Sequence, residues 1–146
     1  MAYLTPAELE TRFGAGDLLA WTDDDASGAL DAAVVAAALA AADAIIDAAA
    51  SQRYVTPLTL GSDTTARVVR DVAGALAGYR LAARRPRDVP ATLRLDYTDA
   101  LKWLERLRDG KVTLAGEAVV SAAPPSGGIV VGGGSTLVDR DSLDGF

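Results

Sequence analysis

The chain has 146 residues and a net charge of −6, and half of its residues are apolar but only 5% are aromatic, which favours one domain with a core of small aliphatic side chains. It contains no cysteine and no histidine, so disulfide bonds, Cys/His zinc sites and imidazole bases are excluded. Because no convincing nucleophile–base pair remains, we expect a protein that is not an enzyme and has no cofactor.

The charge is unevenly distributed along the chain. Residues 1–50 have nine acids and one base, residues 51–110 have eleven bases and seven acids, and the remainder has two bases and four acids. Such an arrangement predicts either charge pairing between copies of the chain or ordinary solvated helix faces. The candidates for pairing between subunits are Asp43, Asp47, Arg67, Arg70 and Arg84. The negative total argues against strong nucleic-acid binding.

The first predicted helix is marked by a capping box. Thr5 and Glu8 have the spacing at which a cap side chain and the third helical residue bond to each other's main chain, and a proline occupies the first helical position. We expect a short helix that runs to about Phe13 and ends at Gly14. Asp17 is then placed to cap a further short turn.

An acidic stretch between residues 23 and 31 has two interpretations. Counted from its first aspartate, oxygen ligands fall at positions 1, 3, 5 and 9 and glycine at position 6, as in the first part of an EF-hand calcium loop. These candidate ligands are Asp23, Asp25, Ser27 and Asp31, with the main chain of Ala29. The position that requires a bidentate glutamate is Val34, so the stretch is also an Asx-rich turn whose last member caps the next helix. We therefore commit to no metal site.

The stretch from about Ala32 to Ser51 is an alanine-rich helix that we expect at the centre of the fold. It is apolar around most of its circumference, so neighbours should cover it on several sides, while Asp43 and Asp47 form a narrow polar strip. Its longest uninterrupted apolar run ends at Ala42 and is too short to cross a bilayer. The first residues also lack the features of a signal peptide, so we expect an intracellular protein with no membrane contact.

Two more long helices are predicted at about residues 64–84 and 90–109. The first has Gly74 and Gly78 four residues apart, which is costly in an isolated helix and indicates that another backbone lies very close there. The second ends at Gly110, a common C-terminal stop. Together these elements predict an all-α protein, a small helical bundle around a central alanine-rich helix with an extended, partly β or irregular C-terminal arm.

The composition changes after residue 110, which predicts a helical domain of residues 1–110 and a flexible docking arm of residues 111–146. Gly-, Ser- and Pro-rich runs surround a small apolar island at residues 129–131 and are typical of linkers. The apolar residues at the end of the chain predict either a docking peptide that becomes ordered on a partner or a disordered tail. The docking candidates are Leu137, Val138, Arg140, Leu143 and Phe146.

Three stretches of the sequence, taken in order, resemble one protein family. They are A-Y-L-T-P-A-E-L-E-T-R-F-G at the start, T-D-D-D-A-S-G-A-L-D through A-D-A-I-I-D to R-Y-V-T-P-L, and D-R-D-S-L-D-G-F at the end. The chain looks like the head-completion proteins of Mu-like phages and prophages, also called head–tail connector or adaptor proteins. The family usually has a third aspartate where Ser27 stands, so the resemblance gives little support to a metal role.

This resemblance implies a small α-helical structural protein of the virion. Many copies would form a homo-dodecamer ring beneath the portal protein, which extends the DNA channel and offers a surface to a downstream stopper or tail-terminator protein. DNA would pass through without sequence-specific binding. The implied location is the head–tail interface of the virion, after assembly in the host cytoplasm. The alternative is a small helical interaction domain with a calcium-binding acidic loop.

Overall fold

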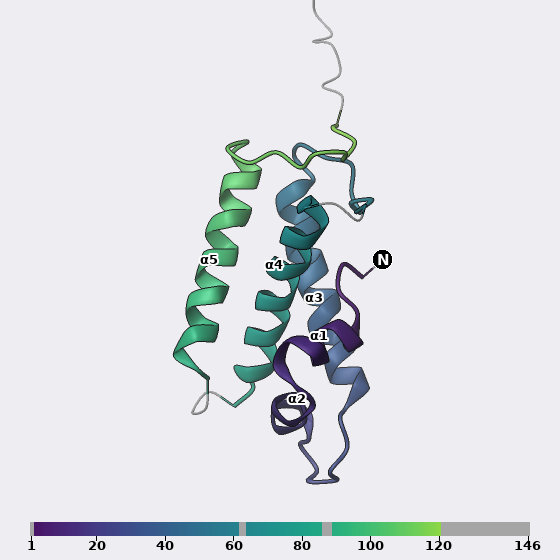
Figure 1. Cartoon of the computed structure of the whole chain (residues 1–146), viewed down its shortest axis with the longest axis vertical. Helices are drawn as coiled ribbons and strands as arrows, with labels where there is room; N and C mark the ends of the chain where they lie inside the picture. The colour runs from purple at the N-terminus through teal and green to yellow at the C-terminus, as the bar shows by residue number, and fades with distance from the viewer. Residues whose placement is uncertain (1, 62–63, 86–88, 121–146) are drawn as a thin grey trace, which may run out of the picture.

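The computed structural model describes residues 2–61, 64–85 and 89–120, and within these ranges the chain forms five α-helices and no strand. The helices are α1 (Pro6–Phe13), α2 (Ala15–Thr22), α3 (Ala32–Ala50), α4 (Thr64–Ala82) and α5 (Ala91–Arg108). The three long helices lie side by side, α1 packs against α3 and α4, and α2 packs against α1 and α4 (Figure 1). The all-α class predicted from the sequence is confirmed.

The first two helices follow from local sequence signals. The Thr5 hydroxyl accepts a hydrogen bond from the Glu8 N–H at 3.2 Å, and the Thr5 N–H donates to the Glu8 carboxylate at 2.8 Å, which confirms the capping box. Gly14 ends α1 with a φ of +85°, and this turn lets α2 begin at Ala15. Asp17 therefore lies inside the first turn and is not the cap we expected, although its charge there suits the helix dipole.

The third helix begins at its predicted cap and is longer than its apolar run. The Asp31 carboxylate accepts hydrogen bonds from the N–H groups of Ala33 at 2.9 Å and Val34 at 3.1 Å, which confirms its role as the N-cap. The expectation from sequence concerned only the uninterrupted apolar run that ends at Ala42, whereas the whole of α3 is, by length and composition alone, long and apolar enough to cross a membrane, with a mean hydropathy of 1.9. Core helices of helical bundles meet the same criteria, and α3 packs against α1, α4 and α5.

The most enclosed helix is α4, whereas we expected the helix at residues 32–51 to be central. Eleven of the nineteen residues of α4 are buried, against six of nineteen in α3, and α4 contacts all four other helices. The expectation was wrong because alanine is apolar but small, so leaving its single methyl group in water costs little free energy. The outer side of α3 accordingly exposes a row of alanines, namely Ala36, Ala40, Ala44 and Ala48.

Two glycines on α4 leave room for side chains of α1. A Cβ atom at Gly74 would lie 3.1 Å from Cδ of Arg12, and one at Gly78 would lie 2.6 Å from Cε2 of Phe13. The close neighbours are therefore side chains, and our expectation of another backbone at this place was wrong. The Phe13 ring also meets Trp21 of α2 edge to face, with ring centroids 5.5 Å apart, so this contact holds both short helices on α4.

The first ten residues of the predicted arm pack on the helical body. Leu114 is only 5% exposed, and its N–H donates to the Tyr54 hydroxyl at 2.9 Å. Tyr54 and Val119 also form an isolated antiparallel bridge. The packed body thus continues through residues 111–120 and does not stop at the predicted boundary after residue 110. Helical periodicity ends at that boundary, and it carries no signal for an irregular segment held by a buried leucine and a tyrosine.

Replacing Gly78 by alanine should destabilise the fold by about 1–3 kcal/mol, the usual range for overpacking, because the new methyl group would overlap the Phe13 ring. The measurement is the free energy of unfolding in urea, followed by far-UV circular dichroism. Gly16→Ala is the matched control, since nothing lies within 4 Å of its Cβ position, and it should stabilise α2 by roughly 0.4–1 kcal/mol. Equal effects of the two substitutions, or an undiminished effect of Gly78→Ala in a Phe13→Ala background, would contradict the contact.

Candidate functional site

The N-terminal segment is fastened to α3 by a buried tyrosine. The main-chain N–H of Tyr3 donates to the Asp43 carboxylate at 3.2 Å, and its hydroxyl donates to the Asp47 carboxylate. The same hydroxyl accepts a hydrogen bond from the Leu58 N–H at 2.8 Å. Asp43 and Asp47 therefore have partners within their own chain, and the polar strip we expected on α3 is covered by the first residues of the protein.

Burial changes the titration of this cluster. Desolvation is the main cause that raises the pKa of Asp43, and it outweighs the lowering effect of the hydrogen bond from the Tyr3 N–H. Desolvation, followed by the hydrogen bond to the Asp47 carboxylate, also raises the pKa of the Tyr3 hydroxyl. The hydroxyl therefore stays protonated and remains a donor throughout the physiological pH range.

Most of the arginines expected between subunits also have partners inside the chain. Arg84 pairs with Asp24 and donates to the main-chain oxygen of Trp21 at 3.2 Å, while Arg70 lies 4.0 Å from the Glu8 carboxylate. Within the described ranges, Arg67 is exposed and takes part in no ion pair. The five predicted pairing residues are thus spread over the molecule and do not form one site.

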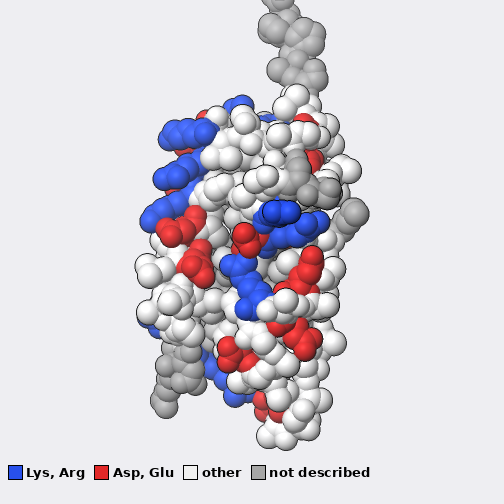
Figure 2. Space-filling view, viewed as in Figure 1, with Lys and Arg blue, Asp and Glu red and all other residues white. Residues whose placement is uncertain are grey.

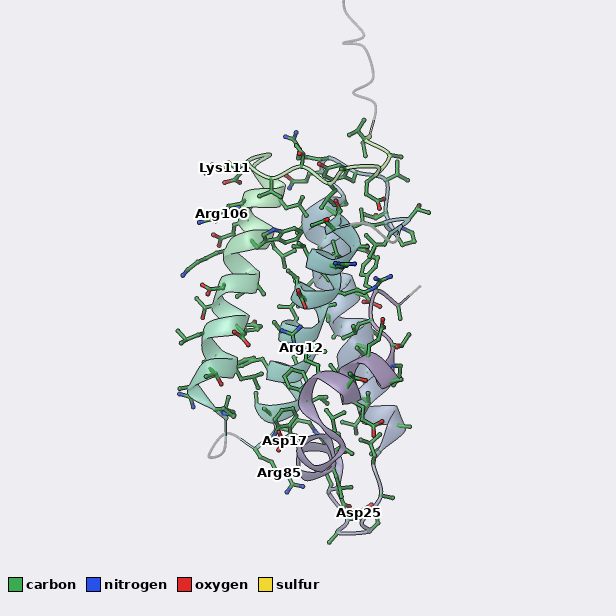
Figure 3. All side chains as sticks on the ribbon, viewed as in Figure 1. Arg12, Asp17, Asp25, Arg85, Arg106 and Lys111 are labelled. Atoms are coloured by element: carbon green, nitrogen blue, oxygen red, sulfur yellow. The ribbon has the colours of Figure 1, made fainter. Side chains whose placement is uncertain are left out.

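Charged side chains of both signs remain exposed on the bundle. On the face shown in Figure 2, basic and acidic side chains are interspersed, and basic ones gather at the end where α5 stops. Arg106 and Lys111 lie at the end where α5 stops, and Asp17 and Asp25 lie at the other end (Figure 3). Arg106, Asp17 and Asp25 are exposed and form no ion pair with any described residue. Arg85 also lies at the end that carries Asp17 and Asp25 (Figure 3), so each end has charges of both signs, and the charges without a described partner, which sequence spacing alone did not locate, can contact other molecules.

The acidic loop after α2 is organised by its own main chain. The Asp23 carboxylate accepts hydrogen bonds from the N–H groups of Ser27 and Gly28, both at 2.8 Å, and these bonds lower the pKa of Asp23. Asp31 is occupied as the α3 cap, and Asp25 is exposed. Among the described residues no group of three or more acidic side chains is placed to hold a metal ion. The geometry is that of an Asx-rich turn.

The predicted docking residues cannot be placed in the fold. They lie outside the described residues and are Leu137, Val138, Arg140, Leu143 and Phe146. The structure instead shows an apolar surface that sequence reasoning missed, made of Val55, Val119 and Val120, which are 54%, 67% and 48% exposed. In the sequence, this apolar surface is indicated only by the two successive valines Val119 and Val120 beyond the last predicted helix. Their sequence does not show whether residues 111–120 pack on the body.

Comparison with known proteins decides the family. Residues 3–132 match the family described as Bacteriophage Mu, Gp36. The chain belongs to this bacteriophage Mu Gp36 family. It is also 34% identical over 100 residues to gene product J of Escherichia phage Mu, an alignment that covers 68% of this chain and 65% of that relative. The chain thus matches slightly less than two thirds of the length of the phage Mu protein.

Family membership confirms the resemblance to Mu-like phage proteins that the sequence suggested. It supports a structural or assembly role in a phage for this Gp36-family chain. The matched region extends from Tyr3 to beyond the last described residue, so it includes the tyrosine that fastens the N-terminus, the five helices and the segment that packs after α5. The shared sequence is therefore mainly that of the folded body.

Millimolar calcium should leave the melting temperature of this Gp36-family chain unchanged, because Asp23 and Asp31 already accept main-chain hydrogen bonds. Thermal unfolding and titration calorimetry with calcium, and with magnesium as the control ion, measure this. A binding heat together with a rise in melting temperature, both lost in Asp23→Asn, would contradict the assignment of the loop as a turn.

The stability of the fold should depend on pH through Asp43. Its pKa is raised in the folded state, so its contribution is fully present below the unfolded value of about 3.9 and is lost as the pH rises through the folded value. The wild type should therefore gain free energy of unfolding relative to Asp43→Asn when the pH is lowered from about 7 to about 4. Urea unfolding of both proteins across this range tests it, and a difference that stays constant or has the opposite sign would refute it.

Proposed function

We propose that the chain is a structural adaptor of the phage neck and not an enzyme. Many copies, a dodecamer by analogy with the family it resembles, form a ring between the portal protein and a downstream neck or tail protein. The observation that carries this proposal is membership of a Mu phage family over residues 3–132, joined to a small helical body with exposed charges at both ends. The proposed location is the head–tail interface of the virion, reached from the host cytoplasm during assembly.

The free charges favour a repeating contact between different faces of neighbouring copies. Arg106 at one end of the subunit and Asp17 and Asp25 at the other end (Figure 3) are complementary charges that form no ion pair with any described residue. A contact between two different faces can repeat around a closed ring, whereas a contact of one face with itself stops at a dimer. This proposal assigns the pairing between subunits to residues other than the five expected from sequence; of those five, only Arg67 forms neither an ion pair nor a side-chain hydrogen bond with the described part of the chain.

The channel that we propose does not read DNA sequence. The net charge of the chain is −6, while specific nucleic-acid proteins usually present a basic surface with side chains that reach the bases. A negative lining would let packaged DNA pass without retaining it. No membrane partner is proposed, because α3, the one helix among the described residues that is apolar enough to span a membrane, is packed against three other helices.

The end of the chain is proposed as the portal-binding element. Its ten last residues carry four apolar side chains and Arg140, a composition that suits a segment which becomes ordered on a partner. The arginine would pair with an acidic site on the portal. The last described segment, residues 111–120, follows α5 and lies at the end of the bundle where α5 stops (Figure 1).

Deleting residues 135–146 should weaken binding to purified portal rings by at least about tenfold, because each buried leucine or phenylalanine contributes about 1.5–3 kcal/mol. Surface plasmon resonance measures the affinity, and negative-stain images of the mixture show whether rings form. Leu143→Ser with Phe146→Ser should reproduce most of the loss, and Ser142→Ala is the matched control. Unchanged affinity after the deletion would refute the docking role, and images without rings would refute the adaptor ring itself.

A further inference from the structure

Residues 53–55 and 118–120 pair through one isolated antiparallel bridge where the described part of the chain ends, and this short pairing, which is not a regular strand pair, is called the ribbon below. The Val55 N–H donates to the Ala118 carbonyl at 2.8 Å, and the Val120 N–H donates to the Arg53 carbonyl at 2.9 Å. These two bonds flank the antiparallel bridge between Tyr54 and Val119. In this pattern the N–H and C=O of Val119 point away from the partner strand, so the outer edge of residues 118–120 has open main-chain hydrogen-bonding groups.

The ribbon is held rigidly from the inner side. Its chain enters through Leu114, whose N–H is bonded to the Tyr54 hydroxyl at 2.9 Å. The Glu117 carboxylate accepts a hydrogen bond from the Thr59 N–H at 2.9 Å. With the two main-chain bonds of the ribbon, four hydrogen bonds fix the edge strand before any further chain meets it, which lowers the entropy lost when another strand pairs with it.

The outer edge is also unusually apolar. Five large hydrophobic residues are exposed in the described ranges, and three of them, Val55, Val119 and Val120, belong to this ribbon. Within the described residues no hydrogen bond engages the main chain of Val119. An exposed edge strand without charge is a template for pairing with another strand, and folded proteins usually cover such edges. Something is therefore expected to occupy this edge.

We propose that residues 129–131 of the same chain occupy the edge as a third, antiparallel strand beside residues 118–120. This segment is Ile-Val-Val, three β-branched residues that favour a strand. It would satisfy the main chain of Val119 and cover the exposed valines with matching apolar side chains. The proposal concerns the chain's own fold and does not rest on the proposed adaptor function.

The length and composition of the connection select this occupant. Eight residues, 121–128, separate the two segments, and they include Pro-Pro-Ser-Gly-Gly, which is typical turn sequence. Parallel strands need a crossover of about a dozen residues or more, so only antiparallel order is possible. There is no charged residue from Ala118 to Ser135, and a tether this short gives an effective concentration of about millimolar, which favours the chain's own segment over one from a second molecule.

The absence of natural cysteines allows a direct test by disulfide trapping. Val119→Cys with Val130→Cys places two thiols on the proposed neighbouring strands, where a Cα separation of about 5.5 Å suits a disulfide. Val119→Cys with Thr136→Cys is the matched control. The rate of disulfide formation in glutathione buffer is measured for both full-length variants, under native conditions and in urea. Circular dichroism checks that the helices are unchanged.

For a chain without structure, the longer loop of the control should slow closure only about twofold, because loop closure scales weakly with length. Under native conditions we expect the disulfide of Val119→Cys with Val130→Cys to form more than about tenfold faster than that of the control. In urea this ratio of rates should fall to about twofold. A native ratio near twofold would overturn the proposal. Mixing isotope-labelled and unlabelled copies identifies the other occupant: disulfides formed mainly between copies would overturn pairing within the chain and assign the edge to a second molecule.

Discussion

The close approach of other elements to α4 depends on its small side chains, and most of the fold follows from this constraint. Alanines of α4 are buried where α3 and α5 pack against this helix, and the gaps above Gly74 and Gly78 accept the Arg12 and Phe13 side chains of α1. The Phe13 ring contacts Trp21 of α2, and the acidic loop that follows α2 is paired to Arg84 through Asp24. Larger residues on α4 would separate these layers one after another. Close packing of this kind transmits a change of even one methyl group to neighbouring elements.

Two tyrosine hydroxyls hold the irregular segments on the helical body. Each accepts a hydrogen bond from a buried main-chain N–H that no helix or sheet satisfies, Tyr3 from Leu58 and Tyr54 from Leu114. Buried polar groups of the backbone require such partners. As a result the N-terminus, the loop after α3 and the segment after α5 are parts of the body.

Structural features set by neighbouring residues, such as helix caps, could be predicted from the sequence. Contacts between segments that are far apart in the sequence could not. The caps at Thr5 and Asp31 need only neighbouring residues, so both were predicted correctly. The central position of α4 was missed because the many alanines of α3 suggest burial, whereas an alanine can stay exposed at little cost. Asp43 and Asp47 looked like a solvated strip because nothing in their own helix shows that Tyr3, some forty residues earlier, covers them. The ribbon was missed for the same reason, since its paired residues Tyr54 and Val119 are 65 positions apart in the sequence.

The distribution of ion pairs has a consequence for how the protein responds to ionic strength. Every ion pair in the described part of the chain involves side chains that are at least 32% exposed, and exposed pairs of this kind contribute little to stability. The subunit is therefore held by apolar packing and hydrogen bonds, which added salt barely screens. The contact that we propose between the charged ends of neighbouring subunits would be screened strongly. Salt should separate copies from one another well before it loosens any single copy.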